Sequence, residues 1–122
     1  MALTVNAYEK IDNVFVIAPT GKIDITTYAV LEKKVDEILQ NYPKDLTFDM
    51  REVDYISSAG IRVVLKAHKA MKQRGWKVNL LHLQPQVKKV FEIIKALPKA
   101  QIFSSVEELD AYLDRIQSNI LK

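Results

Sequence analysis

The chain has no cysteine, only three glycines and four prolines, and no long apolar run. The lack of cysteine excludes disulfides, thiolate nucleophiles and zinc sites built on sulfur. The amino terminus has no basic segment followed by an apolar one, and no apolar run approaches the roughly 20 residues that span a bilayer. The sequence therefore predicts a cytoplasmic protein that is neither exported nor inserted in a membrane.

The chain also lacks a strong charge of one sign. Its 18 basic residues are interspersed with 15 acidic ones, which leaves a net charge of +3. There is no basic stripe with aromatic residues and no recognisable reading motif, so direct binding to nucleic acid is not expected. A hydrophobic content of 48% is enough for one core, and 122 residues are too few for two domains of ordinary size. We expect a single domain over residues 1–122.

Apolar spacing and turn residues predict an α/β fold with the element order ββαβαβαβα. Short strands that are each followed by a helix need crossover connections, so the sheet is expected to be mixed and mostly parallel, with an opening hairpin. A capping box, Ser105-x-x-Glu108, marks the start of the last helix. The predicted strands are 3–7, 14–18, 46–50, 76–83 and 102–103, and the predicted helices are about 26–40, 58–74, from Pro85 to before Pro98, and from Ser105 to about Ile120.

The least ordinary segment is 49–61, Asp-Met-Arg-Glu-Val-Asp-Tyr-Ile-Ser-Ser-Ala-Gly-Ile, which is expected to run from a strand end through a short loop into a helix. Strand ends in α/β sheets are where functional sites gather. Ser57 or Ser58 can cap this helix, because a serine oxygen accepts a hydrogen bond from a free backbone N–H of the first turn. The same N–H groups and the positive end of the helix dipole also favour a phosphate on serine. Composition and spacing leave both interpretations open.

The segment Tyr55-Ile56-Ser57-Ser58-Ala59-Gly60-Ile61 resembles the hallmark loop of the STAS domain family, named for sulfate transporters and bacterial anti-sigma factor antagonists. The earlier segment Gly21-Lys22-Ile23-Asp24 is similar to the family's glycine-x-hydrophobe-aspartate motif. The element order, the turn at Gly75 and the helix after Pro85 are similar as well. The resemblance covers the chain from about Leu3 to Leu113.

The resemblance implies a STAS-like fold and a bacterial, cytoplasmic regulator that binds an anti-sigma factor, itself an ATP-dependent serine kinase, and so frees a sigma factor for transcription. Phosphorylation by that kinase would switch the antagonist off, and a phosphatase would be a further partner. The family's phosphorylated serine, two residues before the motif glycine, corresponds to Ser58. Ser57 replaces the acidic residue that often precedes it and is the alternative acceptor. The runner-up function is a STAS-like adaptor without a phosphoswitch, or a small-ligand sensor.

The same resemblance predicts a partner-binding set on the two motif loops, namely Asp24, Ser57, Ser58, Ala59, Gly60 and Arg62. Asp24 is expected to order its loop or contact a partner, or instead to cap a helix near Thr26. Arg62 stands where many sigma-factor antagonists carry a small residue, which suggests a different partner. Arg62, Lys66 and Lys69 share a helix face by their i, i+4, i+7 spacing, and this row either meets an acidic partner or is simply solvated.

An enzyme is not expected. Ser58 as a nucleophile would need a histidine base, but His68 falls ten positions later on the same predicted helix, roughly 15 Å away at 1.5 Å per residue. His82 is predicted to lie in an apolar strand. The sequence has no G-x-S-x-G elbow, P-loop or dinucleotide-binding glycine motif. We expect the domain to fold without a metal or cofactor.

Overall fold

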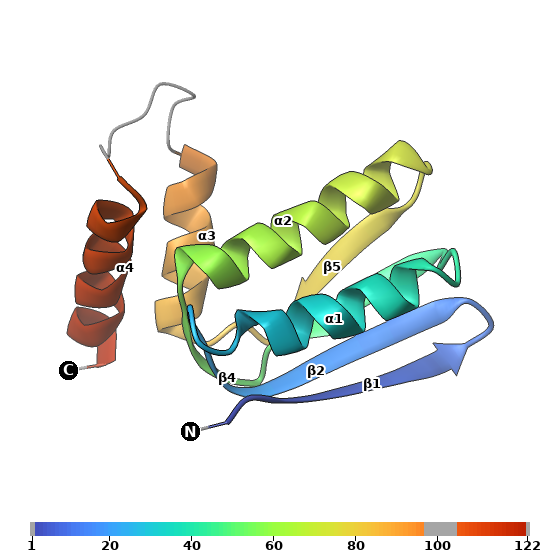
Figure 1. The fold of residues 1–122 in the computed structure, drawn as a ribbon, viewed down its shortest axis with the longest axis horizontal. Helices are drawn as coiled ribbons and strands as arrows, with labels where there is room; N and C mark the ends of the chain where they lie inside the picture. The colour runs from blue at the N-terminus through green and yellow to red at the C-terminus, as the bar shows by residue number, and fades with distance from the viewer. Residues whose placement is uncertain (1, 97–104, 122) are drawn as a thin grey trace.

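A computed structural model describes residues 2–96 and 105–121. It confirms the predicted α/β class with a mixed sheet (Figure 1). The predicted strand at 102–103 lies outside the described residues. The elements are β1 (Thr4–Ile11), β2 (Val14–Ile23), α1 (Tyr28–Leu39), β3 (Asp45–Asp49), β4 (Glu52–Ile56), α2 (Ser58–Gln73), β5 (Lys77–Leu81), α3 (Pro85–Ala96) and α4 (Val106–Leu121).

The long strand β2 organises the sheet. It pairs antiparallel with β1 through a tight turn in which Asn13 adopts a left-handed φ of 63°. Its first half, Val14–Ile17, pairs in parallel with β3, and its second half, Thr20–Ile23, pairs in parallel with β4. On the far side of β3 lies β5, also parallel. One strand thus carries two successive partners along the same edge.

Two sequence-based expectations about this region were wrong. The second strand was predicted to end at residue 18, but β2 continues to Ile23 because β4 supplies a new partner, with a bulge between Gly21 and Lys22. Gly21 makes this possible, since its φ of 122° suits only glycine. The stretch after β3 was predicted to be a loop, yet it forms β4, where Val53 and Ile56 are fully buried.

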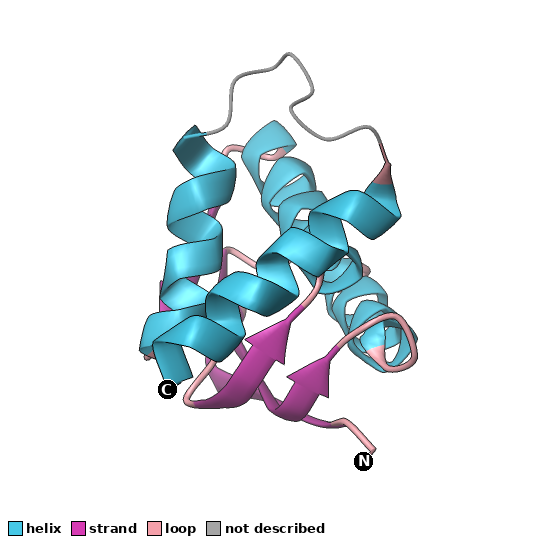
Figure 2. Ribbon diagram, turned by 90° about the vertical axis from the view of Figure 1, so that its left-hand side faces the viewer, coloured by secondary structure: helices cyan, strands magenta, loops and turns pink. Residues whose placement is uncertain are grey.

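The helices lie on one side of the sheet in both views (Figures 1 and 2). The pair α1 and α2 packs along the strands, whereas α3 and α4 pack against each other beside β4 and the start of α2. The Ser105 hydroxyl accepts a 3.1 Å hydrogen bond from the Glu108 N–H, as the capping box predicts. The core between the layers includes Ile17, Ile23, Leu31, Val35, Leu46, Phe48, Met50, Val53, Ile56, Ala67, Met71, Val87, Val90 and Leu113.

Candidate functional site

The two motif loops meet where the parallel strands β2 and β4 end. Ile23 and Ile56 are register partners, and the Ser57 N–H donates a 2.9 Å hydrogen bond to the Ile23 carbonyl. The loop that carries Asp24 therefore lies beside the junction between β4 and α2 that carries Ser57 and Ser58. This edge, the carboxyl end of parallel strands, is where open α/β sheets place their sites.

Gly60 explains how closely α2 approaches the strands at this edge. A Cβ atom at position 60 would lie 2.5 Å from Cγ2 of Ile23 and 2.7 Å from Cγ1 of Ile56, and both isoleucines are fully buried. Any side chain would push the first turn of α2 away from the strand ends. The motif glycine is needed here for contact distance, because only hydrogen fits.

The two serines are placed differently from a simple helix cap. Ser57 is the N-cap residue, with φ −95° and ψ 176°, but its hydroxyl makes no capping hydrogen bond. The alternative in which a serine oxygen caps this helix is therefore wrong. Both hydroxyl oxygens, on Ser57 and on Ser58, are buried and have no hydrogen-bond partner. Only 4% of the Ser57 residue surface is exposed.

A residue from the far end of the chain takes over the capping. The Ser58 N–H donates a 2.8 Å hydrogen bond to Oδ1 of Asp110, on the second turn of α4. A carboxylate at this position satisfies a free donor of the helix start and faces the positive end of the dipole. The Ser58 N–H is one of the groups at the helix start that were expected to favour a phosphate. In this structure it is already bound to Asp110.

Gln117 of α4 makes the second connection to the junction. Its carboxamide accepts a 2.9 Å hydrogen bond from the Ile56 N–H and donates one of 2.9 Å to the Ile56 carbonyl. It also donates to the Leu113 carbonyl at 3.2 Å, and only 1% of its surface is exposed. The side chain pairs with β4 as the backbone of another strand would, so it covers polar groups that the sheet leaves unpaired.

Carboxamides from α3 and the turn before it bind the middle of β4 and the residue that precedes the strand. Nε2 of Gln84 donates to the Arg51 carbonyl at 2.8 Å, and Nε2 of Gln86 donates to the Asp54 carbonyl at 3.0 Å. The two side chains also bond to each other at 2.8 Å. Gln86 and Gln117 therefore bind polar groups of β4, and Gln84 binds the residue just before it.

Asp24 orders its own loop. Its Oδ1 accepts hydrogen bonds from the Thr26 N–H at 2.9 Å and the Thr26 hydroxyl at 2.6 Å, and the hydroxyl of Thr27, the N-cap of α1, lies 3.3 Å away. The Thr26 hydroxyl bond, ahead of the opposing effect of burial, lowers the pKa of the Asp24 carboxyl. The Asp24 carboxylate therefore orders the loop just before the N-cap of α1. Its contact with a partner remains a prediction.

The remaining predicted residues surround the junction unequally. Ala59 and Gly60 are buried in the first turn of α2, whereas Arg62 is exposed. The basic row is interrupted, because Nζ of Lys66 pairs with Asp36 at 3.2 Å and with Glu32 at 3.5 Å, both on α1. The Asp36 hydrogen bond is the largest cause that raises the pKa of Lys66.

An aromatic residue and a cation flank the site on the strand side. Nζ of Lys22 lies 5.4 Å from the centre of the Tyr55 ring and 3.8 Å from Oδ1 of Asp54. Burial raises the pKa of Tyr55, and the nearby carboxylates of Asp114, Asp110 and Asp24 raise it further. Acidic side chains from the Asp24 loop and from α4 therefore converge on the tyrosine next to the serines.

The histidines lie apart from the serines. His68 is on α2, nearly three turns beyond Ser58 at 3.6 residues per turn. His82 was predicted to lie in a strand, but it follows β5 in an exposed turn with a left-handed φ of 57°.

Among the described residues, no group of three or more histidine or acidic side chains is placed to hold a metal ion. None of the helices in that part of the chain combines the length and hydropathy needed to cross a membrane.

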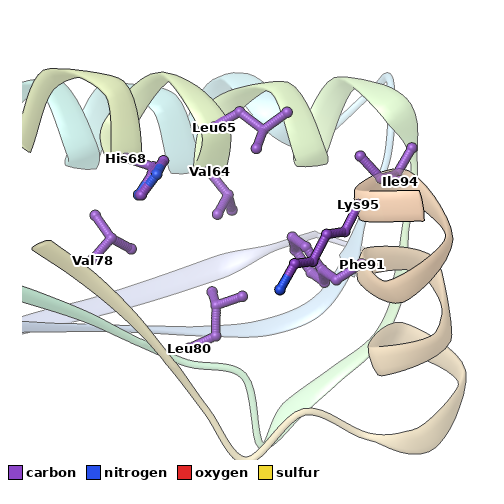
Figure 3. Close-up of a pocket in the computed structure, with 8 residues that line it drawn as sticks. All are labelled: Val64, Leu65, His68, Val78, Leu80, Phe91, Ile94 and Lys95. Atoms are coloured by element: carbon purple, nitrogen blue, oxygen red, sulfur yellow. The ribbon is translucent and has the colours of Figure 1, made fainter. Parts of the chain in front are cut away.

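A separate apolar groove lies between α2, β5 and α3, away from the serines (Figure 3). Its volume is about 530 Å³. Lys95 directs its amino group into the groove, and His68 stands at the α2 side. The lining residues are Val64, Leu65, His68, Val78, Leu80, Phe91, Ile94 and Lys95.

Sequence reasoning missed Asp110 and Gln117, although a signal was present. The two polar residues are seven positions apart, which is about two helical turns, and they flank the buried Leu113 on the same face of α4. Polar side chains on an otherwise apolar stripe indicate a buried polar partner. Nothing in the sequence indicates that this partner is the serine junction.

Comparisons with known proteins agree on the family and the fold. The model of the STAS domain matches residues 6–109. BtrV of Bordetella bronchiseptica, a protein provisionally named an anti-sigma factor antagonist, is 33% identical over 85 residues, 70% of this chain and 73% of BtrV. The Bacillus protein SpoIIAA in its phosphorylated form is similar with a TM-score of 0.64 at 18% identity, covering 93% of this chain and 99% of SpoIIAA. A Thermotoga maritima structure, provisionally named an anti-sigma factor antagonist, is similar with a TM-score of 0.67 at 18% identity, covering 88% of this chain and 93% of that one.

Proposed function

This chain belongs to the STAS domain family, and we propose that it is an anti-sigma factor antagonist that binds a serine-kinase-type anti-sigma factor and is switched off by phosphorylation of Ser58. The observation that carries the proposal is the position of Ser58, the first residue of α2 at the carboxyl edge of the sheet and beside the Asp24 loop. The unphosphorylated and phosphorylated structures of SpoIIAA, whose fold this chain shares, support a phosphorylation switch.

The switch follows from the charge that the modification adds. In the transfer, Oγ of Ser58 bonds to the γ-phosphorus of ATP, the bond to the bridging oxygen breaks, ADP leaves, and the hydroxyl proton passes to a base of the kinase. The product carries about −1.5 to −2 charges at the start of α2. A partner that packs over this helix start would then face a desolvated anion and bind more weakly. A phosphatase that hydrolyses the phosphoserine would restore binding in the cytoplasm.

Three variants test the proposal against serine-kinase-type anti-sigma factors encoded in the same genome, incubated with ATP. Ser58→Ala should bind the kinase yet accept no phosphate, Ser57→Ala should still be phosphorylated, and Ser58→Asp should bind at least about tenfold more weakly. Phosphopeptide mapping and titration measure both properties. Phosphate on Ser57 would move the acceptor by one residue, and full-strength binding by the phosphorylated protein would end the switch proposal.

A second candidate function, sensing of a small ligand, is favoured by the apolar groove. Its volume falls within the roughly 300–1,000 Å³ typical of ligand sites. Apolar walls with one lysine directed inward suit an apolar molecule that carries a carboxylate. Titration with decanoate, followed by amide chemical shifts, should perturb α2, β5 and α3 in the wild type and less in Lys95→Gln. Unchanged shifts in these elements would remove this candidate.

A further inference from the structure

The acceptor hydroxyl of the proposed switch is closed off in this structure. Oγ of Ser58 is inaccessible to solvent and has no hydrogen-bond partner, although the residue begins a helix at the edge of the sheet. A kinase must bring the γ-phosphate within bonding range of that oxygen. The closed form of the junction is therefore not a substrate, and an opening step has to precede the transfer.

Helix α4 is hydrogen-bonded to the junction at two points. Asp110 holds the Ser58 N–H, and Gln117 holds both backbone polar groups of Ile56. These bonds join positions 52 and 61 residues apart in the sequence, so nothing local maintains them. Between them, Leu113 is fully buried in the core. Moving α4 away would uncover the junction and leave β1–β3 and their pairing unchanged.

The same contact opposes the phosphorylated form electrostatically. The Asp110 carboxylate already sits 2.8 Å from the first N–H of α2, where a phosphate on Ser58 would be drawn by the helix dipole. Two anions at one helix start repel each other, more strongly where water is excluded. The phosphate and Asp110 therefore compete for one position.

We propose that α4 is an intramolecular clamp on the serine junction, so that docking of α4 through Asp110 and Gln117 and phosphorylation of Ser58 exclude each other. The proposal rests on Ser58 being the acceptor of the proposed function. It assigns Asp110 and Gln117 as positioning residues that control access to the acceptor. Unphosphorylated protein holds the clamp closed, and phosphorylated protein releases α4.

The absence of cysteine makes the opening step measurable without any kinase. In Ser58→Cys the single thiol replaces the acceptor oxygen, and its reaction with 5,5′-dithiobis(2-nitrobenzoate) reports how often the junction opens. Asp110→Ala in this background should speed the reaction at least about tenfold, because a hydrogen bond to a charged group is lost. Glu107→Ala is the matched control, since it removes the same charge from the exposed surface of α4 one turn before Asp110. It should change the rate less than about twofold.

Reference thiols and a milder variant keep the result interpretable. Ser118→Cys places an exposed thiol on α4 and gives the unhindered rate. Asp110→Asn keeps an acceptor oxygen, so the thiol in that variant should react at a rate between those of the unaltered Asp110 background and Asp110→Ala. It also replaces Asp110→Ala in the test if the alanine variant unfolds the helix. Reaction of Ser58→Cys at the rate of Ser118→Cys, or no effect of either Asp110 variant, would overturn the clamp.

Phosphoserine encoded genetically at position 58 tests the exclusion itself. Amide hydrogen exchange over α4 should be at least about tenfold faster than in the unmodified protein, with β1–β3 unchanged. Unchanged exchange over α4 refutes the clamp even if the phosphate still weakens binding to the kinase. Faster exchange together with undiminished kinase binding supports the clamp and refutes the proposed function, so the two failures are distinct.

Discussion

The serine junction and the apolar groove are both formed against α2, yet one is closed and the other open. At the junction, Ile23 and Ile56 are fully buried, and glutamine carboxamides bind backbone groups of Asp54 and Ile56 in β4. In the groove, Leu65 remains 47% exposed and Leu80 37% exposed. In the described part of the chain β5 pairs with β3 alone. Whether a region beside α2 is closed therefore depends on whether other parts of the chain supply polar partners for the exposed strand edge. The number of apolar side chains in the region does not decide it.

The strongest way to break this contrast is to remove the carboxamide from α4. Gln117→Leu keeps the volume but leaves the Ile56 N–H without its acceptor, so the free energy of unfolding should fall by about 3 kcal/mol. Gln73→Leu, at an exposed position of α2, should change it by less than about 0.5 kcal/mol. Urea unfolding measures both. Equal effects would mean that closure does not depend on the Gln117 bonds.

A second change tests closure by steric contact. In Gly60→Ala the added methyl group meets Ile23 and Ile56, which should cost about 2 kcal/mol despite the better helix propensity of alanine. Gly75→Ala, where the methyl group meets nothing within 4 Å, should lose only about 1 kcal/mol from its left-handed backbone. If the Gly75 variant is the less stable of the two in urea, the contact argument fails.

The groove should tolerate substitution far better. Leu65→Gln changes a half-exposed wall residue, so it should cost less than about 1 kcal/mol of unfolding free energy. Val63→Ala, at a buried position of the same helix outside the groove, should cost about 2 kcal/mol. Thermal unfolding of both variants checks the order. A larger loss for Leu65→Gln would show that the groove is part of the packed core.

The smallest effect concerns Asp24 and pH. Because the folded-state pKa of Asp24 is lowered below 3.8, its carboxylate contributes stability that is present above that value and is lost as the pH falls through the folded pKa. Asp24→Asn should therefore be slightly less stable than wild type at neutral pH, and the two should converge below pH 3.8. Melting curves across this range measure the difference. A constant difference would assign the effect to hydrogen-bond geometry rather than charge.

Local patterns were sufficient to predict most of the fold. The helices α1, α2 and α3 follow apolar spacing and proline signals, and Ser105 marks the start of α4 by its capping bond. These features depend on neighbours in sequence. The hallmark loop also predicted that Ser58 would stand at the start of a helix beside the Asp24 loop.

The errors arise where distant partners decide the outcome. β2 extends past Gly21 and β4 forms at all because the two strands pair with each other. The Ser57 hydroxyl does not cap α2, and the first N–H of that helix is instead bound by Asp110, from the end of the chain. Propensity and spacing describe short stretches, and they carry no information on which carboxylate reaches a helix start 52 residues away.

The pairing of Gln117 with Ile56 also restricts how this sequence can diverge. A primary carboxamide is the one side-chain group that donates to a carbonyl and accepts from an N–H in the same plane, and asparagine is one methylene too short. Leucine at position 113 can give way to isoleucine or methionine at small cost, whereas position 117 has no equivalent replacement. In a saturation library selected for folding, position 117 should therefore keep glutamine while its apolar neighbours drift. Homologues that carry another residue at position 117 should also lack the acid at position 110. Both side chains bind the serine junction only when α4 docks there, so neither is needed when α4 docks elsewhere.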